Sequence, residues 1–429
     1  MKVLNFALST VAYGDTLIGI GLTNQLRTAG VESHYVISRA AEALIRHHGY
    51  PYTVVEPEQG RKVRDVIDSV VREVQPDAFV LADYLNYWGT LIRRFDTDPW
   101  FLDDYQLPVL PIDIWEWENT SFRFDVCGRE YEREVSRRIL DMPAHLRPVP
   151  VCHLDAGASG RGFPYRILPP EQRLSEAGRR AVRAELGLAA TDRLLMVPVS
   201  AWQQPGKDEP GMTEMITRLA DGVPGLLASY LRRLPSNTHF LFIGQHVPAP
   251  FRALPAEQLH LLPLCPPDRY HALLCASDAV LSLTTNAVTV IRALLMDIPA
   301  MLLTNRFHVP DAAAIEAVDG ELGGLGPAAR TWLGHTVPIE PFRLWPKGLH
   351  AFMEPLLKGN GYPDAIARRE LLDEEGVVSG LEALLHDPAT RDRLAQDRAR
   401  YVAAVEALPP TYEVFAAAAR RAGLPSRAL

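Results

Sequence analysis

The sequence predicts an α/β protein built from two consecutive domains that each contain a parallel sheet and face each other across a cleft. Two observations predict this fold class. Apolar runs of strand length alternate with helical stretches along the first part of the chain, and the same alternation restarts after a segment rich in glycine and proline. Because strand, helix and strand follow one another, the strands should pair in parallel through right-handed crossovers.

Composition excludes several other classes of protein. The chain has 429 residues, of which 47% are hydrophobic and 22% are charged, with a net charge of −8. A mainly disordered chain is therefore excluded, and the negative charge argues against a nucleic-acid partner. No apolar run reaches the roughly 18 residues of a membrane span, and no signal cleavage site is evident, so we expect a cytoplasmic protein. The four cysteines show no zinc or CxxC spacing.

Each element of the first half follows from a short apolar or amphipathic run. Strands are apolar runs bounded by turn residues, and helices are amphipathic stretches that stop at glycine or before proline. In chain order, the expected elements are strand Val3–Ser9, helix Leu17–Ala29, strand His34–Ile37, helix Arg61–Val74, strand Ala78–Ala82 and strand Val109–Ile114.

A break in composition separates the halves. Ala156–Gly162 holds three glycines, and Pro164, Pro169 and Pro170 follow, which predicts an interdomain linker or a mobile loop. We expect an N-terminal domain over residues 1–165 and a C-terminal domain over residues 166–405. Residues 406–429 would form a terminal segment whose helix crosses back to the first domain.

The second half repeats the alternation. The expected elements are helix Glu171–Leu186, strand Leu194–Val199, helix Leu226–Leu234, strands His239–Ile243 and Leu261–Leu264, helix Tyr270–Ala276, strand Ala279–Leu283, helix Thr289–Met296, strand Ala300–Thr304 and helix Tyr412–Ala422. Residues 306–365 are rich in glycine, proline and aromatics and are expected to form irregular loops. Within them, Phe342–Lys347 is a candidate flap over the cleft, which the sequence alone does not decide.

Ligands of open α/β sheets bind beyond the carboxyl ends of the strands. Those positions are Ser9–Thr16, Asp83–Gly89, Asp113–Glu118, Ser200–Lys207, Gly244–His246 and Thr284–Asn286. No dinucleotide fingerprint or Walker A motif occurs among them.

The first of these positions contains Gly14 and Asp15 just before a helix. Gly14 suits a tight turn, and Asp15 could face the cleft as a general base. Aspartate is also a preferred helix N-cap, so both interpretations of Asp15 stay open.

The last position opens a helix that carries Thr289 and, three residues later, Arg292. The free N–H groups and the dipole at a helix N-terminus favour an anion, and a guanidinium on the same face would add contacts to a phosphate. The alternative is that Thr289 caps the helix and Arg292 pairs with Asp278 or Asp297.

These segments resemble known glycosyltransferases. The layout is similar to the GT-B glycosyltransferases, in which two Rossmann-like domains bind the acceptor and a nucleotide-sugar donor. Tyr13-Gly14-Asp15 resembles the turn of bacterial protein-arginine rhamnosyltransferases, and its Gly-Asp also resembles that of the heptosyltransferases. Pro266–Tyr270 resembles the rhamnosyltransferase segment that holds the donor base, with Leu264 at one of its aromatic walls. Thr289–Arg292 resembles the diphosphate segment.

The resemblance implies a metal-independent, inverting transfer from an NDP-sugar, dTDP- or UDP-linked, with no further cofactor. By this analogy Asp15 is the catalytic base, Tyr270 packs on the donor base, and Thr289 and Arg292 hold the diphosphate. The rhamnosyltransferases carry a second aspartate where this chain has Val11. A catalytically silent nucleotide-sugar-binding partner of another enzyme therefore stays open, as does a sugar-nucleotide epimerase.

Further site candidates come from the strand ends. Those on the donor side are Trp202, Gln203, Gly244, Gln245, Thr284, Thr285 and Asn286. Those on the acceptor side are Tyr13, Tyr84, Trp88, Asp113, Trp115 and Glu116. If strand geometry continues, Asp113, Trp115 and Trp117 share one side, a mixture that suits a small-molecule natural product or a peptide acceptor. A core or interface cluster explains the same aromatics equally well. The sequence does not give the oligomeric state.

Overall fold

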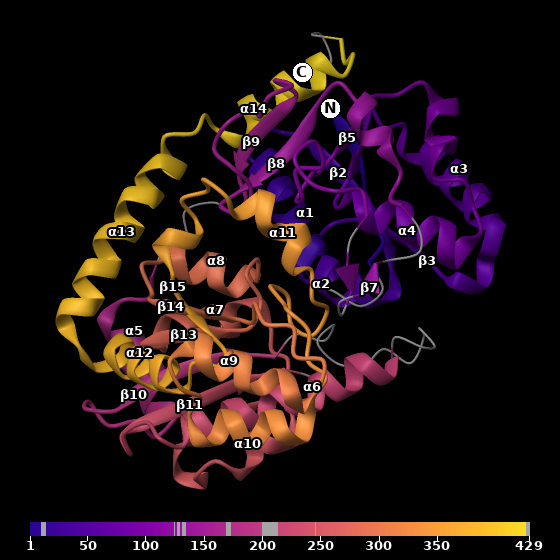
Figure 1. The fold of residues 1–429 in the computed structure, drawn as a ribbon. Helices are drawn as coiled ribbons and strands as arrows, with labels where there is room; N and C mark the ends of the chain where they lie inside the picture. Colours follow the sequence, from indigo (N-terminus) through magenta and orange to yellow (C-terminus); the bar gives the residue numbers. More distant parts are fainter. Residues whose placement is uncertain are drawn as a thin grey trace.

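The computed structural model contains two α/β halves joined end to end (Figure 1). It describes residues 1–9, 14–123, 125–126, 129–130, 134–168, 173–199, 213–244 and 246–425. Tyr13, Trp202, Gln203 and Gln245 lie outside the described residues. In the described part of the chain, none of the helices combines the length and the hydrophobicity that crossing a membrane requires.

The N-terminal half is built on a parallel five-stranded sheet in the order β3-β2-β1-β4-β5. Its strands are β1 (Lys2–Ala7), β2 (Glu32–Ser38), β3 (Tyr52–Val55), β4 (Ala78–Leu81) and β5 (Val109–Pro111). The parallel pair β8 (His145–Val149) and β9 (Gly162–Arg166) lies beside β5, through a bridge between Ile112 and Leu146. The central strands are buried on both faces, which explains their nearly continuous apolar sequence.

Four helices connect these strands: α1 (Gly14–Arg27), α2 (Glu42–His47), α3 (Val63–Val74) and α4 (Tyr84–Phe95). The glycines inside α1 have a packing role. A Cβ on Gly21 would lie 2.2 Å from the carbonyl oxygen of Ile167, so only glycine lets α1 approach the chain that leaves β9.

The segment Ala156–Gly162 connects β8 to β9 inside the N-terminal half. The prediction that it links the two halves was therefore wrong. Its glycines serve a tight local turn, since Gly157 and Gly160 have φ of 70° and 62°. The chain passes into the second half after β9.

The C-terminal half contains a six-stranded parallel sheet in the order β12-β11-β10-β13-β14-β15. Its strands are β10 (Arg193–Pro198), β11 (Thr238–Ile243), β12 (Leu259–Leu262), β13 (Ala279–Ser282), β14 (Ala300–Thr304) and β15 (Ala367–Glu370). The helices that precede, connect or follow these strands in sequence include α5 (Glu176–Glu185), α6 (Thr213–Leu231), α7 (Pro267–Ala276), α8 (Val288–Leu295), α12 (Glu374–His386) and α13 (Pro388–Glu406).

Residues 306–365 are more regular than their composition suggests. They contain the helices α9 (Ile315–Leu322), α10 (Pro327–Thr336) and α11 (His350–Leu357), so the expectation of irregular loops throughout was wrong. Several of the glycines and prolines mark helix ends instead. Pro327 occupies the first turn of α10, and Gly323 ends α9 with φ of 74°.

The last helix, α14 (Thr411–Arg421), packs against the N-terminal half, on β8, β9 and α1. The Thr411 hydroxyl donates to Oε1 of Gln25 over 2.7 Å, and the Gln25 amide donates to the carbonyl of Arg166. The chain thus ends on the half in which it began (Figure 1).

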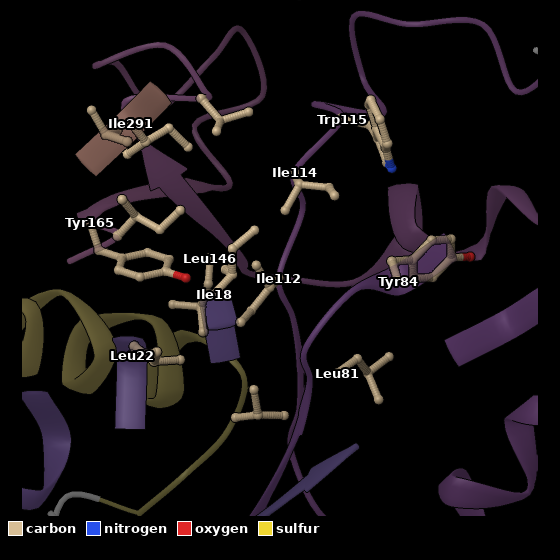
Figure 2. Packing of buried hydrophobic residues seen from close by; sticks show 14 of the residues in the cluster. Ile18, Leu22, Leu81, Tyr84, Ile112, Ile114, Trp115, Leu146, Tyr165 and Ile291 are labelled. Atoms are coloured by element: carbon tan, nitrogen blue, oxygen red, sulfur yellow. The ribbon is translucent and has the colours of Figure 1, made fainter. Parts of the chain in front are cut away.

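One buried apolar cluster extends across both halves. It joins Ile18 and Leu22 of α1, Leu146 of β8 and Tyr165 of β9 with Ile291 of α8 (Figure 2). Ile18 lies one turn beyond Asp15, and Ile291 lies one turn beyond the start of α8. The N-terminal ends of α1 and α8 therefore lie toward the same region between the halves.

Candidate active site between the two sheets

Asp15 follows the first strand of the N-terminal sheet and lies in the first turn of α1. The helix begins at Gly14, so Asp15 is inside the helix rather than at the N-cap position. Its side chain is buried, at 5% exposure. Burial raises its pKa from 3.8 to about 7, against a smaller opposite effect of the Thr16 backbone and the charge of Lys347. A carboxyl with this pKa can exchange a proton near neutral pH.

A second carboxyl, Asp83, stands at the end of the neighbouring strand β4. It caps α4 by accepting the backbone N–H of Leu85 over 3.0 Å. One turn later, Asn86 donates its amide to Asp83 over 2.6 Å and to Asp15 over 3.4 Å. Burial, followed by the charge of Asp15, raises the pKa of Asp83 to about 8. Asn86 thus joins the two carboxyls.

The third carboxyl, Asp113, follows β5 and is fully buried. One oxygen accepts the backbone N–H of Trp117 over 3.2 Å, while the other faces Nδ1 of His145 at 3.6 Å and Nε of Arg147 at 3.8 Å. Burial raises the pKa of Asp113 to about 7 and lowers that of His145 to about 4. Three protonatable aspartates therefore follow three adjacent strands of one sheet.

His145 is in a defined protonation state. Its Nε2 lies 2.7 Å from the carbonyl oxygen of Ile139, which can only accept. The neutral ring must therefore carry its hydrogen on Nε2, and Nδ1 presents a lone pair toward Asp113. A protonated Asp113 complements this arrangement.

The aromatics after β5 do not follow strand alternation. β5 ends at Pro111, and Glu116 adopts a positive φ of 48°, so the condition for placing Asp113, Trp115 and Trp117 on one strand face is not met. Trp115 and Trp117 nevertheless pack on the same residue, Phe352 of α11, with ring centroids 5.5 and 5.6 Å away. They form an apolar contact between the halves.

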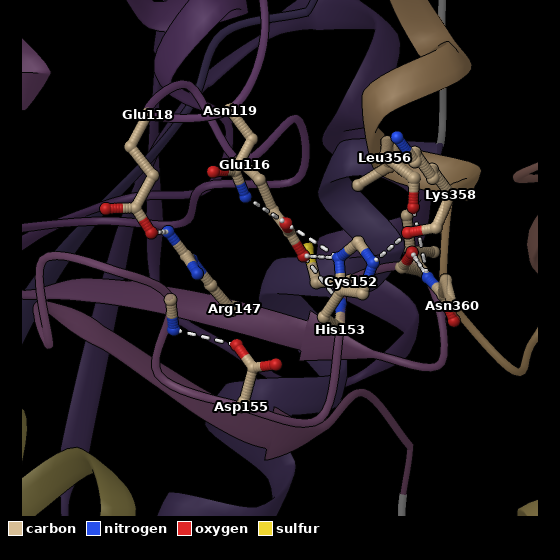
Figure 3. Close-up of polar contacts among 12 residues, drawn as sticks. Glu116, Glu118, Asn119, Arg147, Cys152, His153, Asp155, Leu356, Lys358 and Asn360 are labelled. Carbon is tan, nitrogen blue, oxygen red and sulfur yellow. Dashed lines mark hydrogen bonds and ion pairs between the residues drawn. The ribbon is translucent and has the colours of Figure 1, made fainter.

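Polar contacts beside these tryptophans also join the halves (Figure 3). His153 donates to the carbonyl of Lys358 over 2.8 Å through Nε2, and its Nδ1 lies 2.8 Å from Glu116. The hydrogen bond to Glu116 raises the pKa of His153. Asn360 donates to the carbonyl of Val151 over 3.0 Å. A cavity of about 520 Å³ lies next to these contacts, between the β8–β9 connection and α11.

The remaining acceptor candidates have little exposed surface. Tyr84 is fully buried, and its hydroxyl donates to the carbonyl of Ser136 and accepts the N–H of Ile139. Glu116 is fully buried against His153, and Trp88 is 8% exposed. These three side chains belong to the core and the contact between the halves, so we do not carry them into the functional proposal.

The structure brings together the predicted donor residues of α7 and α8. The hydroxyls of Tyr270 and Thr289 form a hydrogen bond, and Arg292 lies 3.1 Å from Nδ1 of His271. Thr289 does not cap α8, because the N-cap is Ala287, which offers no side-chain acceptor. Leu264, just after β12, is 48% exposed.

The two carboxylates proposed as alternative partners of Arg292 are engaged elsewhere. Asp278 pairs with Arg179 and Arg183, at 2.8 and 2.9 Å. Asp297 accepts two hydrogen bonds from Arg398. Arg292 is therefore in neither ion pair, and it lies three residues after Thr289 in α8.

The end of β13 is held in place by hydrogen bonds to a distant segment. Thr285 donates its N–H and its hydroxyl to the carbonyl of Arg343, and its own carbonyl accepts the Tyr362 hydroxyl. Thr284 and Thr285 are buried, whereas Asn286 is half-buried at the start of α8. Gly244, at the end of β11, lies so close to Val199 that a Cβ would come within 2.6 Å of its carbonyl oxygen.

The individual site residues predicted from the sequence did not include Asp83, Asn86, His145, Arg147, His271 and Lys347. Asp83 and Asn86 do fall in the predicted strand end Asp83–Gly89, and Lys347 falls in the candidate flap Phe342–Lys347. Asp83 and Asn86 had a usable signal, because a capping aspartate and an amide three residues later share one helical face. The others come from β8, α7 and a late loop, and no local pattern connects them to Asp15.

The family profile described as "Family of unknown function (DUF6365)" matches residues 22–423. The chain belongs to the DUF6365 family. No curated protein sequence matches this DUF6365 member.

Solved structures similar to this DUF6365 member share its fold across nearly the whole chain. The spinosyn forosaminyltransferase SpnP aligns with a TM-score of 0.51 and 14% identity over 98% of this chain and 99% of its own. The glycosyltransferase VinC, in complex with dTDP, aligns with a TM-score of 0.52 and 13% identity over 98% of this chain and 99% of its own. A putative UDP-N-acetylglucosamine 2-epimerase from Listeria monocytogenes aligns with a TM-score of 0.53 and 11% identity over 97% of this chain and 94% of its own. The fold is therefore GT-B, with two Rossmann-like domains.

Proposed function

We propose that this protein is a metal-independent, inverting glycosyltransferase that works in the cytoplasm and moves a sugar from a dTDP- or UDP-linked donor to a small-molecule natural product or peptide. One observation carries the proposal. A buried carboxyl with a pKa of about 7 follows the first strand of one sheet, and an uncapped helix bearing Thr289 and Arg292 begins at the other. A base and an anion site across a cleft are what glycosyl transfer requires.

Asp15 would act as the base. Above its pKa it removes a proton from the acceptor nucleophile as that atom attacks the anomeric carbon. Asn86, which donates to Asp15 and to Asp83, would orient the carboxylate. Displacement of the diphosphate from the opposite face inverts the anomeric centre.

The start of α8 would hold the diphosphate. Its first N–H groups face away from the helix without a side-chain cap, and the helix dipole favours negative charge there. Thr289 and Arg292 add a hydroxyl and a guanidinium. The helix end and the guanidinium supply positive charge to the leaving group, which is why the proposal includes no metal ion. Leu264 and Tyr270 would pack on the nucleotide base.

The nature of the acceptor is supported by the structural relatives. One of them is described as the spinosyn rhamnosyltransferase SpnG complexed with spinosyn aglycone, at 14% identity and a TM-score of 0.51. Another is described as the calicheamicin glycosyltransferase CalG4. The first pairs a rhamnosyltransferase with an aglycone, which is the kind of acceptor that we propose. Asp113 and Trp115 are 0% and 6% exposed, so they are set aside as acceptor contacts like the three side chains above.

A sugar-nucleotide epimerase is a second candidate, and the aspartate cluster favours it. Asp15, Asp83 and Asp113 have pKa values raised to about 7, 8 and 7. Carboxyls that exchange protons near neutral pH suit removal and return of a proton at a sugar carbon. One relative is described as a putative epimerase.

The test is to incubate purified protein with a panel of UDP- and dTDP-sugars, with and without candidate acceptors, in buffer containing EDTA. Free NDP is measured by coupled assay, and the sugar is followed by NMR. Asp15→Asn and Arg292→Ala are compared with Arg232→Ala, which removes an exposed arginine just after α6.

A transferase releases NDP only when an acceptor is present, and Asp15→Asn abolishes release while keeping donor binding. An epimerase instead converts the donor into a different NDP-sugar, and it does so without an acceptor. Donor binding with neither reaction identifies a silent partner. Full activity in Asp15→Asn would overturn the assignment of the base, and unchanged NDP affinity in Arg292→Ala would move the diphosphate site elsewhere.

A further inference from the structure

A short hairpin over Arg343–Gly348 closes on itself by backbone hydrogen bonds. The N–H of Arg343 donates to the carbonyl of Gly348 over 2.8 Å, and the N–H of Gly348 donates to Leu344 over 3.0 Å. Trp345 is buried, and its indole donates to the carbonyl of Leu219 in α6 over 3.2 Å. The tip that carries Lys347 is thus fixed to the C-terminal half.

The hairpin is attached to the strand that leads into α8. Leu344 forms a bridge with Thr284, the N–H of Thr285 donates to Arg343 over 3.1 Å, and the N–H of Trp345 donates to Leu283 over 3.1 Å. Thr285 is only two residues from the N-cap of α8. The hairpin therefore lies beside the start of the helix to which we assign the diphosphate.

The same hairpin contacts the N-terminal half. Gly348 forms a bridge with Val126 of β6 (Asp125–Val126). The charge of the neighbouring Lys347 acts on the carboxyl of Asp15 and opposes the effect of burial on its pKa. The hairpin therefore brings the charge of Lys347 within reach of Asp15, beside the strand end that leads into α8.

We propose that Lys347 is a catalytic residue that contacts the donor diphosphate between the start of α8 and Asp15 and stabilises it as it leaves. This inference rests on the proposed function. In the step, the bond between the anomeric carbon and the β-phosphate oxygen breaks, and its electron pair stays on the diphosphate. The acceptor oxygen or nitrogen bonds to the anomeric carbon, and its proton passes to Asp15. The diphosphate gains one negative charge, which an ammonium stabilises.

The experiment measures binding of UDP, dTDP and the parent nucleosides to the full-length protein by calorimetry. The variants are Lys347→Gln, which removes the charge and keeps a polar side chain that is one bond shorter, and Lys347→Arg, which keeps the charge. Lys358→Gln is the matched control, because Lys358 also faces the N-terminal half but lines the separate cavity beside His153. Melting temperatures verify that each variant folds.

We expect Lys347→Gln to weaken NDP binding on the order of tenfold while nucleoside binding stays unchanged, since one charge-assisted contact is lost. Its kcat should fall by about a hundredfold, the usual cost of removing one leaving-charge donor. Lys347→Arg should recover most of the NDP affinity, and Lys358→Gln should behave as the wild type.

Three results would each overturn one of these statements. If the wild type binds NDP and Lys347→Gln binds it equally well with the same kcat, Lys347 has no contact with the diphosphate and the proposed function stands. If the folded wild type binds neither nucleotide, the proposed function itself fails. Equal weakening of NDP and nucleoside binding in Lys347→Gln would assign Lys347 to the fold of the donor site.

Discussion

Asn86 donates its side-chain amide to Asp15 across two neighbouring strand ends, over 3.4 Å, while bonding Asp83 over 2.6 Å. This contact joins the first turn of α1 to the first turn of α4, which are far apart in sequence. It makes the two carboxyls one titrating unit, since the charge of Asp15 also raises the pKa of Asp83.

Replacing Asn86 by leucine should disturb this unit without removing a carboxyl. Asn86 also donates to the carboxylate of Asp15, and a donated hydrogen bond favours the charged form, so its loss should raise the pKa of the base. We expect the acid limb of kcat/KM to move to higher pH, with about tenfold less activity at pH 7 and recovery at pH 9. The pH profile measures this. Asn119→Leu, which removes an amide bonded to Glu116 instead, should leave the limb in place.

The wild-type rate should depend on pH through Asp15. Its pKa is raised to about 7, and only the deprotonated carboxylate accepts a proton, so kcat/KM should rise with pH through that value and then level off. In Asp15→Asn the activity should fall by about a hundredfold or more, and kcat/KM should no longer rise with pH through that value. A flat profile between pH 5 and pH 9 in the wild type would contradict the role of Asp15.

Asp83 should make the protein less stable as pH rises. Its pKa is raised from 3.8 to about 8, so the folded state keeps a proton that the unfolded chain releases. The free energy of unfolding therefore falls with increasing pH across that window, by at most about 1.4 kcal/mol per pH unit.

Asp83→Asn tests this dependence. Asparagine still accepts the N–H of Leu85 as an N-cap and never ionises. The melting temperature of the variant should exceed that of the wild type by more at pH 8 than at pH 5, because the loss in the wild type begins near 3.8 and grows up to about 8. Asp98→Asn is the control, because it changes an exposed N-cap aspartate. Its melting temperature should not exceed that of the wild type at pH 8. A loss of stability in Asp83→Asn at both pH values would show that the carboxyl is held ionised.

Gly244→Ala should destabilise the donor side. The added Cβ would lie 2.6 Å from the carbonyl oxygen and 2.7 Å from Cβ of Val199, and both atoms belong to an adjoining strand end. Overpacking of this kind costs about 1–3 kcal/mol, measured by chemical unfolding. Gly225→Ala in α6 has nothing within 4 Å, so it should be neutral or stabilising. Equal stability of the two variants would refute this packing argument.

The order of strands and helices could be predicted closely, because each element has its own local signal. Strand Ala300–Thr304 was predicted with the bounds it has, and helix Thr289–Met296 differs from α8 by one residue at each end. Prediction failed over 306–365, where helices α9, α10 and α11 are short and bounded by glycine or proline. In such helices tertiary packing outweighs composition.

The sequence by itself determined the α/β class, the two successive parallel sheets and the residue types at the strand ends: an aspartate after β1, and a threonine and an arginine on one turn of α8. Period and turn residues are local, so they can be read without the fold. Only the tertiary structure decided that Asp83 and Asn86 join Asp15, that Trp115 and Trp117 serve the contact between the halves, and that the charge of Lys347 acts on Asp15. Those relationships depend on which strands are neighbours and on burial, which changes the charge state of a carboxyl.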